Sequence, residues 1–359
     1  MVENPSMAVG VPAAAAGPAP MTVEALKCSL GRHRRHLVWV LAVLGVLVAA
    51  LAAAEVMLGN TVYPVQVVLE VLRGAQVKGA TYAIWEVRLP RLAAGLLAGF
   101  AFGVAGNTFQ TMLRNPLASP EVIGITSGAS AVAVACILVA HMGTAGASLW
   151  AVLGSAATAA TIFVLSPAGG FSIGKFILVG LGVQAFMKAV VSYLLLKGAE
   201  FDVPVALRWL NGSLSGTTMD DVSTLLVIVP LTALVMLLGR QLKVLELGDA
   251  SATALGARPL LIRVALVLCC VTMIAFCTAV TGPISCVSLL AGPIATRLVG
   301  QASSSTAAAG LVGAALVLAA DLVGQYVLGT RFPVGVVTGI LGTPYLLYLL
   351  VSMNKKGSA

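Results

Sequence analysis

The sequence predicts an all-α membrane protein with ten transmembrane helices and with both termini in the cytoplasm. Of its 359 residues, 59% are hydrophobic and only 9% are charged, whereas about a quarter of the residues of a typical soluble domain are charged. Runs of about 20 apolar residues, the length that crosses a bilayer as a helix, recur along the chain. An even number of crossings returns the chain to the side on which it began.

Ten apolar segments are long enough to be these helices. The first could instead belong to a signal peptide, but it is long enough to cross a bilayer. An Ala-, Pro- and Gly-rich tail with a basic end precedes it over 1–36, and we expect this tail to be disordered and cytoplasmic. The ten-helix domain then covers 37–353, and 354–359 form a second cytoplasmic tail. The predicted spans lie at about 37–58, 86–111, 121–141, 146–166, 174–196, 222–240, 259–280, 282–300, 306–329 and 332–352.

The charge distribution supports this orientation. With a cytoplasmic N-terminus, most Lys and Arg residues fall in the inner segments, as the positive-inside rule requires. The net charge of +8 could also suggest a nucleic-acid partner, but no basic face with interleaved aromatic residues is present, so none is expected. Several arginines, Arg88 and Arg91 among them, remain on the outer side.

The residues that an enzyme or a metal site needs are missing from the sequence. There is no HExxH motif and no Cys/His spacing of a metal site, so no metal or cofactor is expected. The segment GGFSIGKF at 169–176 nearly matches a phosphate loop but ends in Phe, where Ser or Thr must reach magnesium. An ATP-driven transporter would therefore need a separate ATPase. A proton-driven secondary transporter, which could use Asp321 and Lys188 within the membrane, is the alternative from another class.

The second span carries glycines at four-residue spacing. Gly95, Gly99 and Gly103 fall on one helical face, where the missing side chains let a neighbouring backbone approach closely. We expect this span to pack inside the bundle through these three residues.

The chain interrupts its apolar helices from Arg114 to Glu121. Pro116 and Pro120 cannot continue a helix, so this stretch predicts the cytoplasmic turn between the second and third spans. Ser119 is expected to cap the third span, with Glu121 favourable in its first turn.

Five blocks resemble the FecCD family, the permease subunits of type II ABC importers, which carry ferric siderophores, haem or vitamin B12. The resemblance covers about 38–352, with the blocks in the family's order. It implies ten spans per subunit and two subunits per pore, identical or different. It also implies a cytoplasmic ATPase dimer, an extracytoplasmic substrate-binding protein and transport by alternating access in the cell membrane. Ferric siderophores are the favoured cargo, and haem and cobalamin are the alternatives. The blocks begin at Trp85 (WEVRLPR through RNPLASPEVIGITSGA), Leu207 (LRWLNGSLSG), Leu245 (LELGDASATALGARP), Thr281 (TGPISCVSLLAGPIATRLVG) and Phe332 (FPVGVVTGILGTPYLLYLL).

The resemblance also assigns docking residues for the binding protein. The RLPR motif places Arg88 and Arg91 at family positions that meet acidic residues of the binding protein, since a fixed cation that faces water docks carboxylates well. Asp321 is kept near the outer end of the ninth span, but Gln325 stands where the family tends to have Arg, and Arg331 lies close by in sequence. These arginines could alternatively anchor the chain to lipid headgroups.

The segment at about 245–258 resembles the family's coupling segment, which implies that it seats in a groove of the ATPase. Its two glycines are expected to bracket a two-turn helix; the alternative is an ordinary cytoplasmic loop. The predicted coupling residues are Leu247, Gly248, Asp249, Ala254, Leu255 and Gly256.

The fifth span lines the pore in the family, and here it carries a polar stripe. Gln184, Lys188 and Ser192 fall at i, i+4 and i+8 on one helical face. A lysine at mid-span costs about 2.5–3.5 kcal/mol on insertion scales, so it is expected to face a cavity or a counter-ion. We predict that the stripe lines the translocation pathway, where Lys188 attracts an anionic ferric chelate. Alternatively, Lys188 extends to the outer interface or pairs within the bundle.

Overall fold

The computed structural model describes residues 23–121, 124–166, 173–300 and 305–357. All regular structure in these ranges is helical. The first half of the near-match to a phosphate loop and most of the N-terminal tail lie outside the described residues.

Every predicted span coincides with a helix. The corresponding helices are α1 (Val23–Met57), α4 (Leu89–Leu113), α5 (Ile125–Leu138), α6 (Thr144–Leu165), α7 (Ile173–Lys197), α9 with α10 (Met219–Leu225 and Ile228–Leu237), α13 (Pro259–Thr281), α14 (Val287–Val299), α15 (Thr306–Tyr326) and α16 (Val334–Gly357). In the described part of the chain, seven helical stretches are long and apolar enough to cross a bilayer, and α5, α14 and the apolar part of α16 are shorter. The chain is therefore a multi-pass, all-helical membrane protein, and the count of ten crossings stays a prediction.

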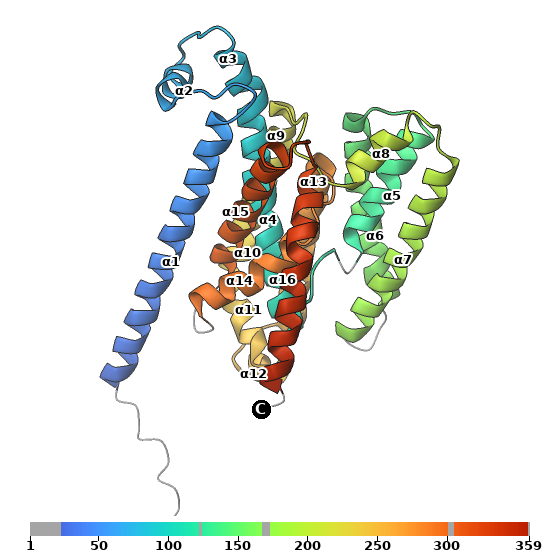
Figure 1. The fold of residues 1–359 in the computed structure, drawn as a ribbon. Helices are drawn as coiled ribbons and strands as arrows, with labels where there is room; N and C mark the ends of the chain where they lie inside the picture. The colour runs from blue at the N-terminus through green and yellow to red at the C-terminus, as the bar shows by residue number, and fades with distance from the viewer. Residues whose placement is uncertain (1–22, 122–123, 167–172, 301–304, 358–359) are drawn as a thin grey trace, which may run out of the picture.

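Shorter helices connect these elements at the two ends of the bundle. They are α2 (Val65–Leu72), α3 (Ala80–Tyr82), α8 (Val203–Leu210), α11 (Gly239–Glu246) and α12 (Asp249–Ala254), and a π-helical stretch over Ala83–Arg88 joins α3 to α4. Helices α2, α3 and α8 lie at one end, which we call the outer end (Figure 1). Helix α12, the start of α1 and the end of α16 lie at the other, which we call the inner end.

Helix α4 forms the centre of the bundle. It packs against α13, α14 and α15, while α1 packs on the far side of α15. Helices α5–α8 form a second group beside the centre (Figure 1), which contacts it where α5 and α6 pack against α13. A Cβ atom at Gly99 would lie 2.8 Å from the Cα atom of Ala314, and one at Gly103 would collide with the carbonyl oxygen of Ala309. At Gly95 the nearest atoms belong to leucine side chains. The glycine spacing thus lets α4 and α15 meet backbone to backbone.

Two predicted boundaries are wrong. Helix α1 begins at Val23, so residues 23–36, expected in the disordered tail, are helical. Helix α5 begins at Ile125 after Gly124, whose φ of 91° is in the left-handed region, and no side chain caps it. Ser119 is therefore not a cap, and Glu121 lies before the helix rather than in its first turn.

Candidate functional site

A cavity of about 510 Å³ lies between the α5–α7 group and the central helices. This volume is in the range of pockets that enclose small-molecule ligands. Its lining comes from the chain before α5, from α5, α7 and α8, and from the connection between α13 and α14: Glu121, Thr126, Ser127, Ser130, Gln184, Lys188, Val191, Ser192, Leu210, Pro283, Ile284 and Ser285. All three residues of the predicted polar stripe are in this set.

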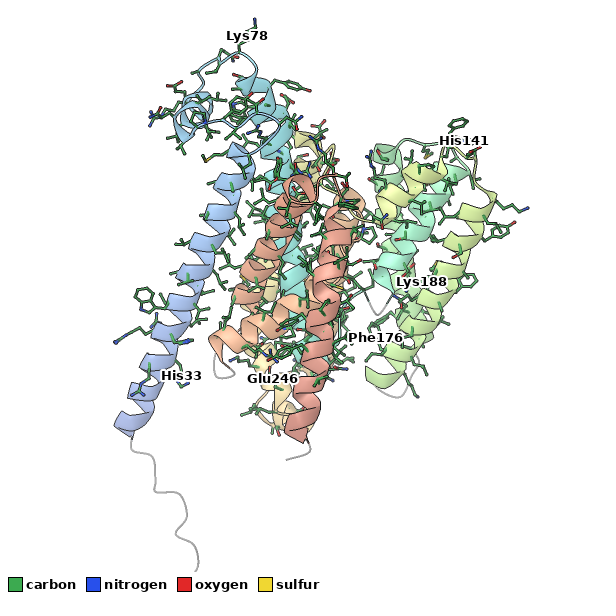
Figure 2. The ribbon with its side chains drawn as sticks, viewed as in Figure 1. His33, Lys78, His141, Phe176, Lys188 and Glu246 are labelled. Carbon is green, nitrogen blue, oxygen red and sulfur yellow. The ribbon has the colours of Figure 1, made fainter. Side chains whose placement is uncertain are left out.

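The stripe faces the cavity from α7. The exposed Lys188 lies on the side of α7 toward the central helices (Figure 2). The amide of Gln184 donates to the backbone carbonyl of Glu121 at 3.1 Å, which ties α7 to the chain that leads into α5. An amide, a cation and a hydroxyl thus follow one another along the cavity wall at successive helical turns.

The cavity also holds a carboxylate, that of Glu121, which sequence reasoning placed elsewhere. The hydroxyl of Ser288, in the first turn of α14, donates to Glu121 at 2.9 Å. Glu121 therefore links the α4–α5 connection to α14, whereas the sequence analysis placed it in the first turn of the third span. A signal existed in the sequence, because an acid inside an apolar region usually has a specific partner.

The cavity wall suits a polar ligand. Thr126, Ser127 and Ser130 bring hydroxyls from α5, and each hydroxyl can both donate and accept a hydrogen bond. Together with Lys188, these groups can hold oxygen-rich anions. No set of three or more His, Cys, Asp or Glu residues that could hold a metal ion occurs within the described ranges.

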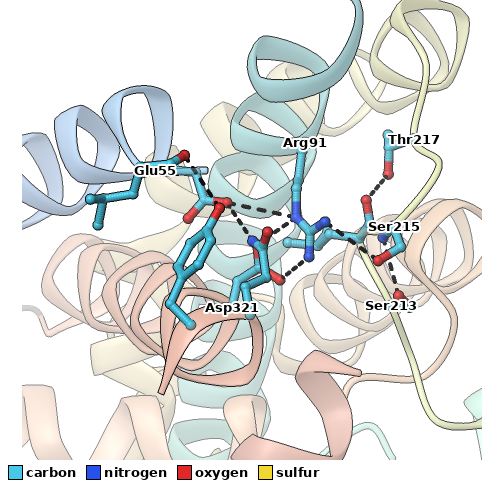
Figure 3. Close-up of polar contacts among 10 residues, drawn as sticks. Glu55, Arg91, Ser213, Ser215, Thr217 and Asp321 are labelled. Carbon is cyan, nitrogen blue, oxygen red and sulfur yellow. Dashed lines mark hydrogen bonds and ion pairs between the residues drawn. The ribbon is translucent and has the colours of Figure 1, made fainter. Parts of the chain in front are cut away.

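The outer end contains a buried charge network (Figure 3). Arg91 of α4 donates to both carboxylate oxygens of Asp321 of α15, at 2.6 and 2.7 Å. Its Nε atom also lies 3.6 Å from Glu55 of α1. Gln325 completes the network by donating to Glu55 at 3.1 Å and to Asp321 at 2.7 Å. The network joins three helices. Its two carboxylates are buried, at 3% and 1% exposed, whereas the side chain of Arg91 is 16% exposed.

Gln325 occupies the position at which the family tends to have arginine. An amide can bridge two carboxylates by donating to both, as it does here. The sequence analysis selected Asp321 and Arg91 but not Glu55, because a single acid at the end of a long apolar helix is typical of an interfacial residue.

The expected water-facing position of Arg88 is wrong. Its side chain is buried, with 9% of its surface exposed. The guanidinium donates to the backbone carbonyls of Val56 at 2.6 Å, Met57 at 2.9 Å and Thr61 at 2.6 Å, and it lies 4.8 Å from the ring centre of Tyr63. The first two carbonyls are at the end of α1, where a cation is stabilising, and the third belongs to the loop that follows α1. Arg88 thus holds the end of α1.

Arg331 does face solvent at the outer end. It is exposed and donates to the side chain of Asn60 at 2.6 Å. Of the three predicted docking arginines, Arg331 is the exposed one, Arg91 is largely engaged within the network, and Arg88 is buried.

The predicted coupling segment forms a short helix at the inner end. Asp249 begins α12 and Ala254 ends it, between two glycines with left-handed φ values, 103° at Gly248 and 81° at Gly256. The expected helix between the two glycines is present, with six residues, which is slightly less than two turns. Leu247 and Leu255 are 63% and 66% exposed, so an apolar side chain protrudes at each end of the helix.

The end of α4 is tied to this segment. Arg114, the left-handed residue that ends α4, donates to the carbonyl of Leu245 at 2.8 Å. This hydrogen bond joins the central helix to the end of α11, the helix that leads into α12.

Comparison with known proteins identifies relatives over nearly the whole chain. The sequence model of the FecCD transport family matches residues 40–352. The ferric enterobactin transport system permease protein FepG of Escherichia coli is 39% identical over 292 residues, which cover 80% of this chain and 88% of that protein. The achromobactin transport system permease protein CbrC of Dickeya dadantii is 38% identical over 322 residues, 88% of this chain and 90% of that protein. A solved structure described as an inward-facing conformation of a metal-chelate type ABC transporter is similar with a TM-score of 0.78 and 25% identity, covering 87% of this chain and 98% of that one.

Proposed function

Because the chain belongs to the FecCD transport family, we propose that it is the permease subunit of an ATP-driven importer that carries ferric siderophores across the cell membrane. The relatives named for ferric enterobactin and for achromobactin support a siderophore as cargo. In this proposal the chain forms the translocation pathway by alternating access, and a separate cytoplasmic ATPase hydrolyses ATP.

The cavity lined by the α7 stripe is the observation that carries this proposal. An anionic chelate gains from the positive potential of Lys188, and the hydroxyls of α5 can replace water around its oxygen atoms. Transport requires binding that is weak enough for release, which a wall of single hydroxyls and one exposed cation can supply. The charged and hydroxylated wall favours a siderophore over haem, because the largely apolar haem ring would bind better against an apolar wall.

The partners follow from the two ends of the molecule. A dimer of cytoplasmic ATPases would receive α12, because the exposed Leu247 and Leu255 offer apolar side chains to a groove at the inner end. A second permease subunit, identical or different, would complete the pore. An extracytoplasmic binding protein would dock at the outer end through Arg331 and the exposed part of Arg91.

A proton-driven mechanism would need an acid that can lose and regain its proton during transport. Asp321, the predicted candidate, is instead held in an ion pair, because Arg91 donates to both of its carboxylate oxygens. Uptake that persists without ATP while the proton gradient is intact would support that mechanism instead.

The pathway is tested by neutralising its cation. Lys188→Met keeps most of the side-chain length and is expected to reduce the uptake of an anionic ferric siderophore about tenfold, with normal amounts of folded protein. Lys188→Glu should impair uptake further because it repels the cargo. Lys197→Met is the matched control, since Lys197 ends the same helix but does not line the cavity.

Accessibility gives a second measurement that does not depend on activity. In a variant whose native cysteines are replaced, a cysteine at position 188 should react with a small water-soluble thiol reagent, and cargo should protect it. Normal transport by Lys188→Met, combined with an unreactive cysteine in every nucleotide state, would show that the pathway lies elsewhere.

A further inference from the structure

A second cavity, of about 540 Å³, lies toward the inner end between α4, α11, α14 and the start of α15. Glu246, which is part of its rim, lies at the lower end of the central helices (Figure 2). It shares no lining residue with the cavity of the α7 stripe. It is therefore a separate site within one subunit, for which the transport mechanism above has no use.

Its lining is strongly cationic. Arg114, Lys243 and Arg297 contribute positive charge from three different elements, and Glu246 is the one acid among the lining residues. Like charges that lie close together around a cavity repel one another. An anion bound in the cavity reduces this repulsion.

The floor of the cavity is polar and ordered. Asn107 and Gln110 of α4 are buried, at 4% and 8% exposed. Asn107 donates to the Thr306 hydroxyl at 3.1 Å and accepts from Ser305 at 2.8 Å. These two hydroxyl residues lie at the start of α15, a 21-residue helix whose N-terminal end adds positive potential to the same cavity.

Arg297 is held in place by aromatic rings. Its guanidinium carbon lies 5.5 Å from the ring centre of Tyr348 and 6.0 Å from that of Tyr345, both on α16, within the range of cation–π attraction. A guanidinium whose position is fixed loses little conformational freedom when it binds a phosphate, and its planar donors match phosphate oxygens.

We propose that this cavity binds a phosphate-bearing anion, either a free phosphate or the headgroup of an anionic lipid of the inner leaflet. Arg297 and Lys243 are its principal ligands, and the start of α15 adds to the attraction. Because Lys243 belongs to α11 and Arg114 bonds to the carbonyl of Leu245, the bound anion would fasten the approach to α12 onto α4 and α14. The site would thus stabilise the inner end of the permease.

The test measures anion binding by the full-length purified chain. In one arm, the thermal midpoint is followed in detergent with increasing pyrophosphate or inorganic phosphate, against chloride at equal ionic strength. In the other arm, nanodiscs of phosphatidylglycerol are compared with nanodiscs of phosphatidylcholine. The test variant is Lys243→Gln with Arg297→Gln. The control is Arg258→Gln, which removes an exposed cation at the same end that does not line this cavity.

We expect stabilisation of the wild type in one arm, which identifies the source of the phosphate group. The double variant should show an apparent affinity weaker by about tenfold or more, as the loss of charge-assisted hydrogen bonds implies, and Arg258→Gln should behave as the wild type. Two results would overturn the proposal. One is stabilisation that is absent from the wild type in both arms or is equal in all variants. The other is a loss of stabilisation in Arg258→Gln as large as that in the double variant, which would place the bound anion outside this cavity.

Discussion

Two matched substitutions on the glycine face of α4 should change the stability of the protein by different amounts. Gly103→Ala and Gly95→Ala each add one methyl group to the same helix, eight residues apart. The added Cβ atom at position 103 meets the carbonyl oxygen of Ala309 in the backbone of α15, whereas at position 95 it lies 3.0 Å from Leu214 and 3.2 Å from Leu318, at the ends of flexible side chains. Backbone atoms can yield only if the two helices separate.

The magnitude follows from two opposing terms. Overpacking lowers the free energy of unfolding by about 1–3 kcal/mol. Replacing a helical glycine by alanine raises it by about 0.5–1 kcal/mol. At Gly103 the collision with backbone calls for the upper value, so the net loss is about 2 kcal/mol. At Gly95 the ends of the leucine side chains can rotate, so the overpacking cost is near the lower value. The gain in helix propensity then nearly cancels this cost.

The chain's own cysteines provide the assay. Cys270 and Cys277 are fully buried, so a maleimide that fluoresces on reaction reports the loss of packing as temperature rises. On the scale of soluble domains, about 2–4 °C per kcal/mol, Gly103→Ala should lower the midpoint by roughly 4–8 °C, while Gly95→Ala should stay close to the wild type. Equal midpoints for Gly103→Ala and Gly95→Ala would refute the backbone-contact argument.

Three further predictions test the other regions. Ala254→Arg places a bulky cation at the exposed end of α12 and should abolish the stimulation of ATP hydrolysis by cargo-loaded binding protein without lowering the thermal midpoint; wild-type transport would exclude this helix from coupling. Asp321→Asn leaves the largely buried Arg91 with Glu55, at 3.6 Å, as its remaining carboxylate partner, and should cost about 3 kcal/mol. The double change with Arg91→Gln should recover part of that loss in the same thermal assay, and an additive loss would show that the pair is not coupled. Arg331→Glu should slow association of the binding protein about tenfold at low salt and less at high salt; association rates equal to the wild type at low salt would remove Arg331 from the docking surface.

The sequence by itself determined the properties that depend on neighbouring residues along the chain. Apolar runs located the helices, because crossing a bilayer requires a local stretch of about 20 apolar residues. Helical periodicity placed Gln184, Lys188 and Ser192 on one face, and the structure puts that face on a cavity. The glycines of the coupling segment marked the two ends of α12, because their left-handed conformation is a local property.

Only the tertiary structure decided which side chains meet across long separations. Arg91 and Asp321 are far apart in sequence, and no local pattern reveals that α4 and α15 bring them within hydrogen-bonding distance. The RLPR motif gave Arg88 and Arg91 the same outward role, yet Arg88 is directed at the carbonyls of α1. Glu121 and Ser288 likewise meet only because the α4–α5 connection passes the start of α14. A buried polar group must find a partner, but the packing of distant helices decides which partner it finds.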